Sequence, residues 1–208
     1  MKKIILLAVL LSVVEASFSQ EEKSQYIRKG LIRSMATISP GDMTKINATT
    51  ISIHGCLEYY VADNISLRGD SYYFLSAKYN YGYILPGGPN PFEFNHSTFS
   101  GASYHFKTKN HFDPYLAIEP GIAITKGKDY SNMFCDPGPC PASGKTSANP
   151  LFSSAIGFNL YFQKWFHLFM ETRYIAGKYI SDAPTPLSLN ELRFSFGLGF
   201  NINALKKK

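Results

Sequence analysis

The chain has 208 residues, a formal net charge of +6, 17% charged residues and 15% aromatic residues. This length suits one domain. The charged share lies below the roughly 25% of an average globular domain, which favours a β protein with extensive apolar surface. After the N-terminus no stretch reaches about 18 consecutive apolar residues, so the sequence excludes a membrane-spanning helix. The mean hydropathy of −0.11 is compatible with a membrane barrel, because its strands alternate in polarity.

The N-terminus has the pattern of a secretory signal peptide. Two lysines precede the apolar run 4–14, and small residues follow with the spacing of a cleavage site after Ser19. The run is too short to anchor the chain by spanning a bilayer. We therefore predict a signal peptide at 1–19 and one β-barrel domain at 20–208. An exported chain of this kind is not expected to bind nucleic acid.

Eight segments predict strands, because large apolar residues alternate in them with small or polar residues at a period of two. In chain order the segments are 28–38, 51–61, 65–76, 98–106, 115–125, 151–162, 166–177 and 190–202. The last segment shows the pattern most plainly, since Phe194 and Phe196 alternate with Arg193 and Ser195. The fifth segment carries Pro120, which predicts a bulge because proline cannot donate a ladder hydrogen bond.

The connections between these segments alternate in length. The short connections are 62–64, 107–114 and 163–165, and the long connections are 39–50, 77–97, 126–150 and 178–189. In an antiparallel up-and-down arrangement every long connection then falls at one end. Short periplasmic turns and long external loops are typical of outer-membrane barrels. The sequence therefore predicts an all-β fold, a closed antiparallel up-and-down transmembrane β-barrel of eight strands.

The polar faces of the strands carry opposite charges two residues apart. The predicted lumen network consists of Glu58, Arg68, Asp70, Glu119, Glu171, Arg173, Glu191 and Arg193. Side chains just fill the interior of an eight-stranded barrel, and buried charges must be paired. The alternative is a soluble barrel or sandwich whose charged faces lie in water. In that case the bulky apolar faces of nearly every strand would fill the interior and leave no space for a ligand. Aromatic residues expected to form girdles near the strand ends are Tyr59, Tyr60, Tyr73, Trp165, Phe166 and Tyr174.

Four parts of the chain carry a resemblance to a known family: the signal pattern, the hairpin EYYVADNISLRGDSYY, the pair GFNLYFQKWFHLFMETRY and the strand FSFGLGF. With them, the mature chain resembles the small eight-stranded outer-membrane β-barrel proteins of Gram-negative bacteria, the OmpX/OmpA-type group. The resemblance implies the bacterial outer membrane as location. It also implies outer-membrane lipids, lipopolysaccharide and the outer-membrane assembly machinery as partners. That machinery reads a terminal aromatic residue, a role that Phe200 matches although the chain continues to Lys208.

One set of residues suggests an enzymatic alternative. Ser103 and His105 share a strand face, and Glu119 on the next strand could orient the histidine, as a hydrolase or acyltransferase acting on lipid A would need. The simpler interpretation assigns these residues, with His54 and His167, to the interior hydrogen-bond network. No cofactor fingerprint or metal-ligand spacing occurs in the sequence.

The loops hold the remaining candidates. Cys135 and Cys140 lie in a Pro/Gly-rich stretch and predict a local disulfide, whereas Cys56 is expected to be a small buried residue. External lysines that could meet lipopolysaccharide phosphates are Lys45, Lys126, Lys128 and Lys145. We therefore predict a non-enzymatic structural or surface anchor without an open pore, whose external loops mediate adhesion or ligand contact. The aromatic loop 77–97 and the cysteine loop are the expected contact surfaces.

Overall fold

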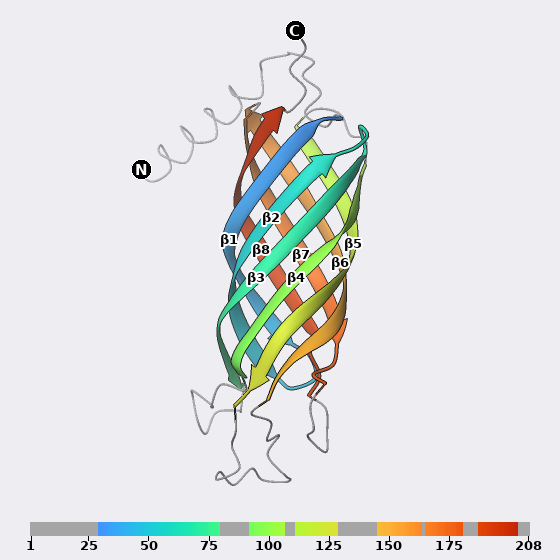
Figure 1. Cartoon of the computed structure of the whole chain (residues 1–208). Coiled ribbons are helices and arrows are strands. Elements are labelled where there is room, and N and C mark those ends of the chain that lie inside the picture. The colour runs from blue at the N-terminus through green and yellow to red at the C-terminus, as the bar shows by residue number, and fades with distance from the viewer. Residues whose placement is uncertain are drawn as a thin grey trace, which may run out of the picture.

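The computed structural model describes residues 29–79, 92–106, 111–128, 145–163, 165–180 and 187–203, which form one closed antiparallel barrel (Figure 1). The strands are β1 (Leu31–Met43), β2 (Ala48–Tyr60), β3 (Ile65–Tyr79), β4 (Phe92–His105), β5 (Phe112–Gly127), β6 (Thr146–Gln163), β7 (Phe166–Gly177) and β8 (Glu191–Asn203). Each strand pairs with its neighbours in sequence, and β8 closes the ring by pairing with β1. The predicted closed up-and-down barrel of eight strands is confirmed. The described residues contain no helix long and apolar enough to cross a membrane.

Most strands continue further than predicted toward the loop end of the barrel, which is the end opposite the β2–β3 turn. The prediction of a long connection at 39–50 is wrong, because β1 and β2 leave only a turn at 44–47, with Asn47 at a φ of 49°. The Pro-Gly-Asp composition of that stretch suggested a loop. Pro40 is tolerated inside β1 because the β1–β8 ladder is interrupted beside it.

The predicted connections 77–97, 107–114 and 126–150 are also too long, since β4, β5 and β6 begin within them. Asp113, expected in a turn, instead lies in β5 and points into the barrel. Polar residues at these strand starts alternate inward and outward like the rest of the strand. Their composition is loop-like because the lumen side of this barrel is polar.

The bulge predicted at Pro120 is wrong. β5 pairs with β6 through Pro120 without a shift in register, and the β4–β5 ladder simply omits Ser100 and Gly101. A side chain at Gly101 would collide with the Ile118 carbonyl and with Glu119, so the two strands approach closely there. The missing proline N–H is thus accommodated by a gap in one ladder. Register shifts occur elsewhere, in the β2–β3, β4–β5 and β6–β7 ladders.

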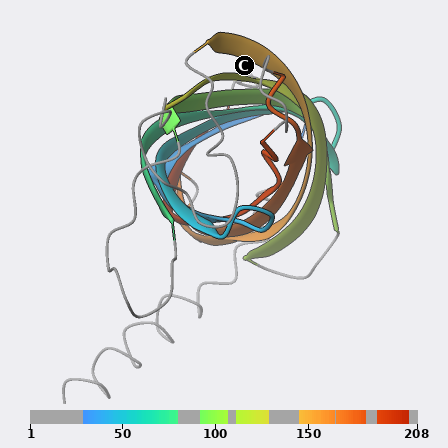
Figure 2. The same cartoon turned by 90° about the horizontal axis from the view of Figure 1, so that it is seen from below.

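The two faces of the wall differ in polarity, and Figure 2 shows the strands as a ring around the lumen. On the outside, Phe196 is 60% exposed and Ile118 and Ile156 are 61% exposed. Among the predicted girdle residues, the prediction for Tyr60 is wrong, because its side chain is fully buried in the lumen, whereas Tyr59 is exposed. Adjacent residues of one strand point to opposite faces, so both tyrosines cannot lie outside.

The loop end of the lumen is filled by an apolar cluster rather than by charges. We define this apolar cluster as Met43, Ala48, Tyr72, Phe74, Ala77, Phe92, Phe99, Ala123, Leu151, Ile175, Tyr179 and Leu189. Tyr179 and Leu189 come from the β7–β8 connection, where Lys178 and Ser188 form an isolated bridge. Described residues at both ends of this connection therefore pack into the lumen, which is apolar at this end and polar over the rest of its length.

Candidate functional site: the polar lumen

The structure places every predicted lumen residue inside the barrel, each with no more than 3% of its surface exposed. These residues project from β2, β3, β5, β7 and β8, at alternate positions that face away from the apolar exterior. They divide into two ion-pair clusters and one separate pair. The structure adds buried charged residues outside this predicted set, above all Arg33 and Asp113.

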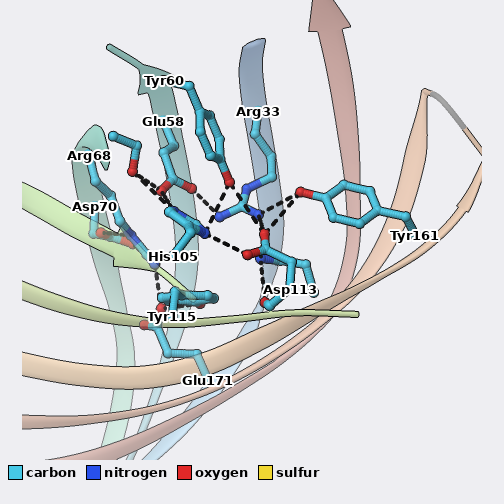
Figure 3. A network of polar contacts seen from close by, with 12 residues as sticks. Arg33, Glu58, Tyr60, Arg68, Asp70, His105, Asp113, Tyr115, Tyr161 and Glu171 are labelled. Carbon is cyan, nitrogen blue, oxygen red and sulfur yellow. Dashed lines mark hydrogen bonds and ion pairs between the residues drawn. The ribbon is translucent and has the colours of Figure 1, made fainter. Parts of the chain in front are cut away.

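The first group is the His105 cluster, defined as Arg33, Glu58, His105 and Asp113 (Figure 3). Arg33 forms ion pairs with Glu58 and with Asp113, the latter at 3.1 Å. The His105 Nδ1 lies 2.8 Å from Asp113 Oδ1, and its Nε2 lies 2.9 Å from Glu58 Oε1. Side chains from β1, β2, β4 and β5 therefore meet at one point and cross-brace the wall.

Neutral hydrogen-bonding groups complete the His105 cluster. The hydroxyl of Tyr161 donates to Asp113 at 3.1 Å, and the amide of Asn159 donates to the same carboxylate at 2.9 Å. Ser66 donates to Glu58. Extending the alternation of β5 backwards from Glu119 would have placed Asp113 on the lumen face. The long-range partners themselves carry no signal in a single sequence.

The second group is the Arg173 cluster, defined as Arg68, Asp70, Glu119, Glu171 and Arg173. Arg173 reaches three carboxylates, at 2.9 Å to Glu119, 3.0 Å to Asp70 and 3.1 Å to Glu171. Arg68 contacts the same three acids, at 2.7 Å to Asp70, 2.5 Å to Glu171 and 3.5 Å to Glu119. Two cations thus bridge three anions in a continuous buried ring, the arrangement that makes buried charge tolerable.

The surroundings of His54, Asp70 and Glu171 do not favour a metal ion. His54, Asp70 and Glu171 have ligand atoms within 4.8 Å of one another. However, the guanidinium groups of Arg68 and Arg173 contact both carboxylates, and His54 Nε2 lies 2.6 Å from Asp70 Oδ1. The donor atoms are therefore engaged in ion pairs, and two fixed positive charges would oppose a cation.

The ring of Tyr115 lies between the two clusters (Figure 3). The guanidinium carbon of Arg33 is 5.6 Å from the ring centroid and that of Arg68 is 5.2 Å from it, both within cation–π range. The Tyr115 hydroxyl donates to Glu171 at 2.7 Å. Tyr115 thus contacts a cation of each cluster and separates them.

Glu191 and Arg193 form the remaining pair, nearer the loop end. Their side chains are 2.7 Å apart, and Arg193 also donates to Ser97 at 2.8 Å and lies 4.4 Å from the Tyr72 ring centroid. Glu191 accepts from Thr50. This pair is where the polar lumen meets the apolar cluster.

The residues of the enzymatic alternative are not brought together as a catalytic group. Both ring nitrogens of His105 face the carboxylates of Glu58 and Asp113, and Glu119 is held by Arg173. Within the described part of the chain, the Ser103 hydroxyl has no hydrogen-bond partner. All three side chains are buried in the lumen, away from the outer surface.

The predicted loop features lie mostly outside the described residues. Cys135 and Cys140 are among them, and so is most of the aromatic loop. Cys56 is buried beside Met35 and Phe169, as a small core residue. At the rim, Lys126 forms an exposed ion pair of 2.7 Å with Glu93.

Comparison with known proteins supports the fold. No family model and no curated protein sequence matches the chain. Among solved structures, it is similar to the outer membrane protein OprG of Pseudomonas aeruginosa, with a TM-score of 0.62, 12% identity, and coverage of 86% of this chain and 99% of that chain. The N-terminal β-barrel domain of P. aeruginosa OprF aligns with a TM-score of 0.51, 15% identity, and 84% and 98% coverage. Neisserial surface protein A aligns with a TM-score of 0.51, 15% identity, and 83% and 96% coverage. The chain therefore has the fold of small outer-membrane β-barrels.

Proposed function

We propose that this chain is an outer-membrane barrel protein that serves as a structural and surface anchor, with external loops that contact a ligand or another cell. The observation that carries the proposal is the inverted polarity of the barrel. Buried ion pairs occupy the lumen, while Phe, Leu and Ile side chains cover the outside. Only a surrounding apolar phase makes this distribution favourable, because burying each such side chain is worth about 1.5–3 kcal/mol.

The anchor is proposed to lack an open pore. Ion pairs cross the lumen between opposite strands, from β1 to β5 through Arg33 and Asp113 and from β7 to β3 through Arg173 and Asp70, and the apolar cluster fills the loop end. An interior filled by side chains is expected for a barrel of this strand number. In planar lipid bilayers we expect no stepwise conductance; regular channel openings would contradict this part of the proposal.

The loops are proposed to carry recognition, and lipopolysaccharide is a proposed partner. Loops held by a rigid scaffold commonly carry binding function. Lysines at the rim, including Lys45, Lys126, Lys128 and Lys145, have the charge that lipid phosphates require. Assembly machinery that reads the region of Phe200 is the other proposed partner. Export by the N-terminal signal pattern remains a prediction.

The protein is proposed not to be an enzyme, because His105 and Glu119 are held in separate ion pairs and neither bonds to the Ser103 hydroxyl among the described residues. Deleting the gene and profiling lipid A by mass spectrometry tests this. We expect an unchanged profile. A lost modification that returns with the wild-type gene but not with His105→Ala would support the lipid A-modifying alternative instead.

The membrane location is tested on the purified protein. Refolded in detergent, it should migrate faster on a gel when unheated than when boiled, as closed barrels do, and it should float with liposomes in a density gradient. A protein that stays soluble without detergent and does not float would overturn the proposal.

A further inference from the structure

His167 is a buried side chain that takes no part in the ion-pair clusters of the lumen. Its ring projects from β7 with no exposed surface, and among the described residues neither of its nitrogens has a hydrogen-bond partner. The other two buried histidines of the described chain, His54 and His105, use both ring nitrogens. Buried polar groups without a partner are rare in native proteins, and a bound water or ion is a usual reason for one.

The Nε2 edge of the His167 ring faces a sulfur-containing residue. Gly199 of β8 pairs with His167 on one side and with Met35 of β1 on the other. A Cβ atom at Gly199 would lie 2.3 Å from His167 Nε2 and 3.0 Å from Met35 Cγ, so both side chains lean over the glycine. A thioether accepts hydrogen bonds only weakly, so Met35 offers little to a water molecule but is a good ligand for a soft metal ion.

A second sulfur lies on the other side of Met35. Cys56 of β2 pairs directly with Met35, and directly paired residues have Cβ atoms about 4.5–5.5 Å apart. Cys56 is a free cysteine, and it packs with Met35 and Phe169 in one small buried cluster. We define His167, Met35 and Cys56 as the sulfur row. Its donors are an imidazole nitrogen, a thioether and a thiol, and thioether and thiolate ligands select Cu(I) among biological metals.

The charges around the sulfur row favour a monovalent ion. Arg33 lies two residues from Met35 on the lumen face of β1. Arg68 contacts Asp70, which is the β3 partner of Cys56. A divalent ion bound to one thiolate would add a net positive charge beside these arginines, and buried charge without a partner is costly. Cu(I) bound to the Cys56 thiolate adds no net charge.

We infer that the sulfur row is a binding site for one Cu(I) ion, held by His167 Nε2, Met35 Sδ and Cys56 Sγ. When the copper–sulfur bond to Cys56 forms, the thiol proton leaves to solvent and copper keeps its oxidation state. Asn201 lies beside the ring, and its amide oxygen is available to accept the Nδ1 hydrogen. The inference concerns metal binding and is independent of the proposed role as an anchor.

The flexibility of Met35 allows the site to form in a filled lumen. Methionine is unbranched and adapts its rotamer to its surroundings, so its sulfur can approach both neighbours of the row. A bare ion does not need the cavity that an organic ligand would require. The donors of the sulfur row also differ from His54, Asp70 and Glu171, whose ligand atoms are engaged in ion pairs.

Copper retention by the refolded chain tests the site. All proteins carry Cys135→Ser and Cys140→Ser, so that loop thiols do not compete. Each is refolded in detergent without oxygen, in Cu(I) buffered by bicinchoninate, so that access to the closed lumen is not limiting. We expect one retained Cu(I) per chain. Met35→Leu, His167→Phe and Cys56→Ser should each lower the affinity about tenfold or more, since even residues outside a ligand set commonly change metal affinity by that factor.

Two matched controls remove the same groups from the outer face. Met170→Leu replaces a lipid-facing methionine, and His96→Phe replaces a histidine of the outer wall. Both should leave the affinity for Cu(I) unchanged, and the gel shift of the unheated protein verifies that each variant is folded. Absence of retained copper, or equal losses in the controls and in the variants of the sulfur row, would overturn the inference.

X-ray absorption at the copper edge tests the ligands in the chain whose lumen is unaltered, so the result does not depend on how a lumen variant folds. We expect sulfur and nitrogen scatterers around Cu(I), with the nitrogen lost in His167→Phe. A shell of oxygen alone would overturn the assignment. An excess of Zn(II) should not displace the copper, and displacement would overturn the soft monovalent class.

Discussion

At the scale of single residues, charged side chains in the lumen share ion-pair partners rather than forming isolated pairs. Arg173 contacts Asp70, Glu119 and Glu171 at 2.9–3.1 Å, and all four side chains are buried. The cost of taking these charges out of water is offset only while every charge keeps its partners. Removing one partner therefore costs far more than the pair contributes when intact.

Arg173→Met should lower the free energy of unfolding by about 3–5 kcal/mol, because it leaves buried carboxylates with one guanidinium in place of two. The matched control is Lys126→Met, which removes the cation of an exposed rim pair and should cost no more than about 1 kcal/mol. Urea titrations in lipid vesicles measure both. Similar losses in the two variants would mean that the cluster is solvated.

At the scale of strands, the closeness of β4 and β5 depends on a position without a side chain. Gly101 faces the lumen where β4 passes Ile118 and Glu119. Gly55 of β2 is a useful contrast, because nothing lies within 4 Å of the place where its side chain would stand. The same substitution can therefore be tested in a crowded and in an open environment.

Gly101→Val should destabilise the barrel by about 1–3 kcal/mol, since it forces the backbones of β4 and β5 apart. Gly55→Val should change the stability by less than about 1 kcal/mol, and in the favourable direction, because valine suits an exposed strand position. Unfolding in urea and the gel shift of the unheated protein report the difference. An undisturbed Gly101→Val barrel would show that the close approach can relax.

The strands also show how much of the fold can be predicted from the alternation of residues in the sequence. Alternation located all of them, because a wall with one polar and one apolar face requires it at every step. It failed near the strand ends, where Pro40 toward the loop end and Asp113 at the opposite end lie in strands but have the composition of turns. The girdle prediction misplaced Tyr60, although the alternation that puts Leu57 and Tyr59 on the apolar face puts Tyr60 on the polar face.

The clusters were predictable only in part for a related reason. Pairs two residues apart on one strand, such as Glu171 and Arg173, can be read from the sequence. The bond between Arg33 and Asp113 joins residues 80 positions apart, and it exists because of the register of intervening strands. A single sequence does not contain that register.

At the scale of the whole molecule, the exterior should behave as a lipid-facing belt whose sensitivity depends on depth. Phe196 lies in the middle of β8 and Ile202 lies near its end, and both are exposed. A lysine on the lipid face of a barrel costs about 2–4 kcal/mol at the midplane and about 0–1 kcal/mol near an interface.

Phe196→Lys should therefore lower the free energy of unfolding in vesicles by about 2–4 kcal/mol, and Ile202→Lys by about 1 kcal/mol or less. The same urea titration checks both variants. If the two substitutions lower the free energy of unfolding equally, the effect of a lysine on the outer face does not depend on its depth in the bilayer. The orientation of the barrel in the membrane must then be revised.

The position of Tyr115 between Arg33 and Arg68 has a consequence for how mutational effects combine. The lumen should consist of two energetic units. Losses from Arg33→Met and Arg173→Met should then be additive within about 0.5 kcal/mol, whereas Arg68→Met and Arg173→Met, which share carboxylates, should show a coupling energy of about 0.5–3 kcal/mol. Double-mutant cycles measure both. Additivity between the two clusters would mean that one cluster can change in sequence during evolution without compensating substitutions in the other.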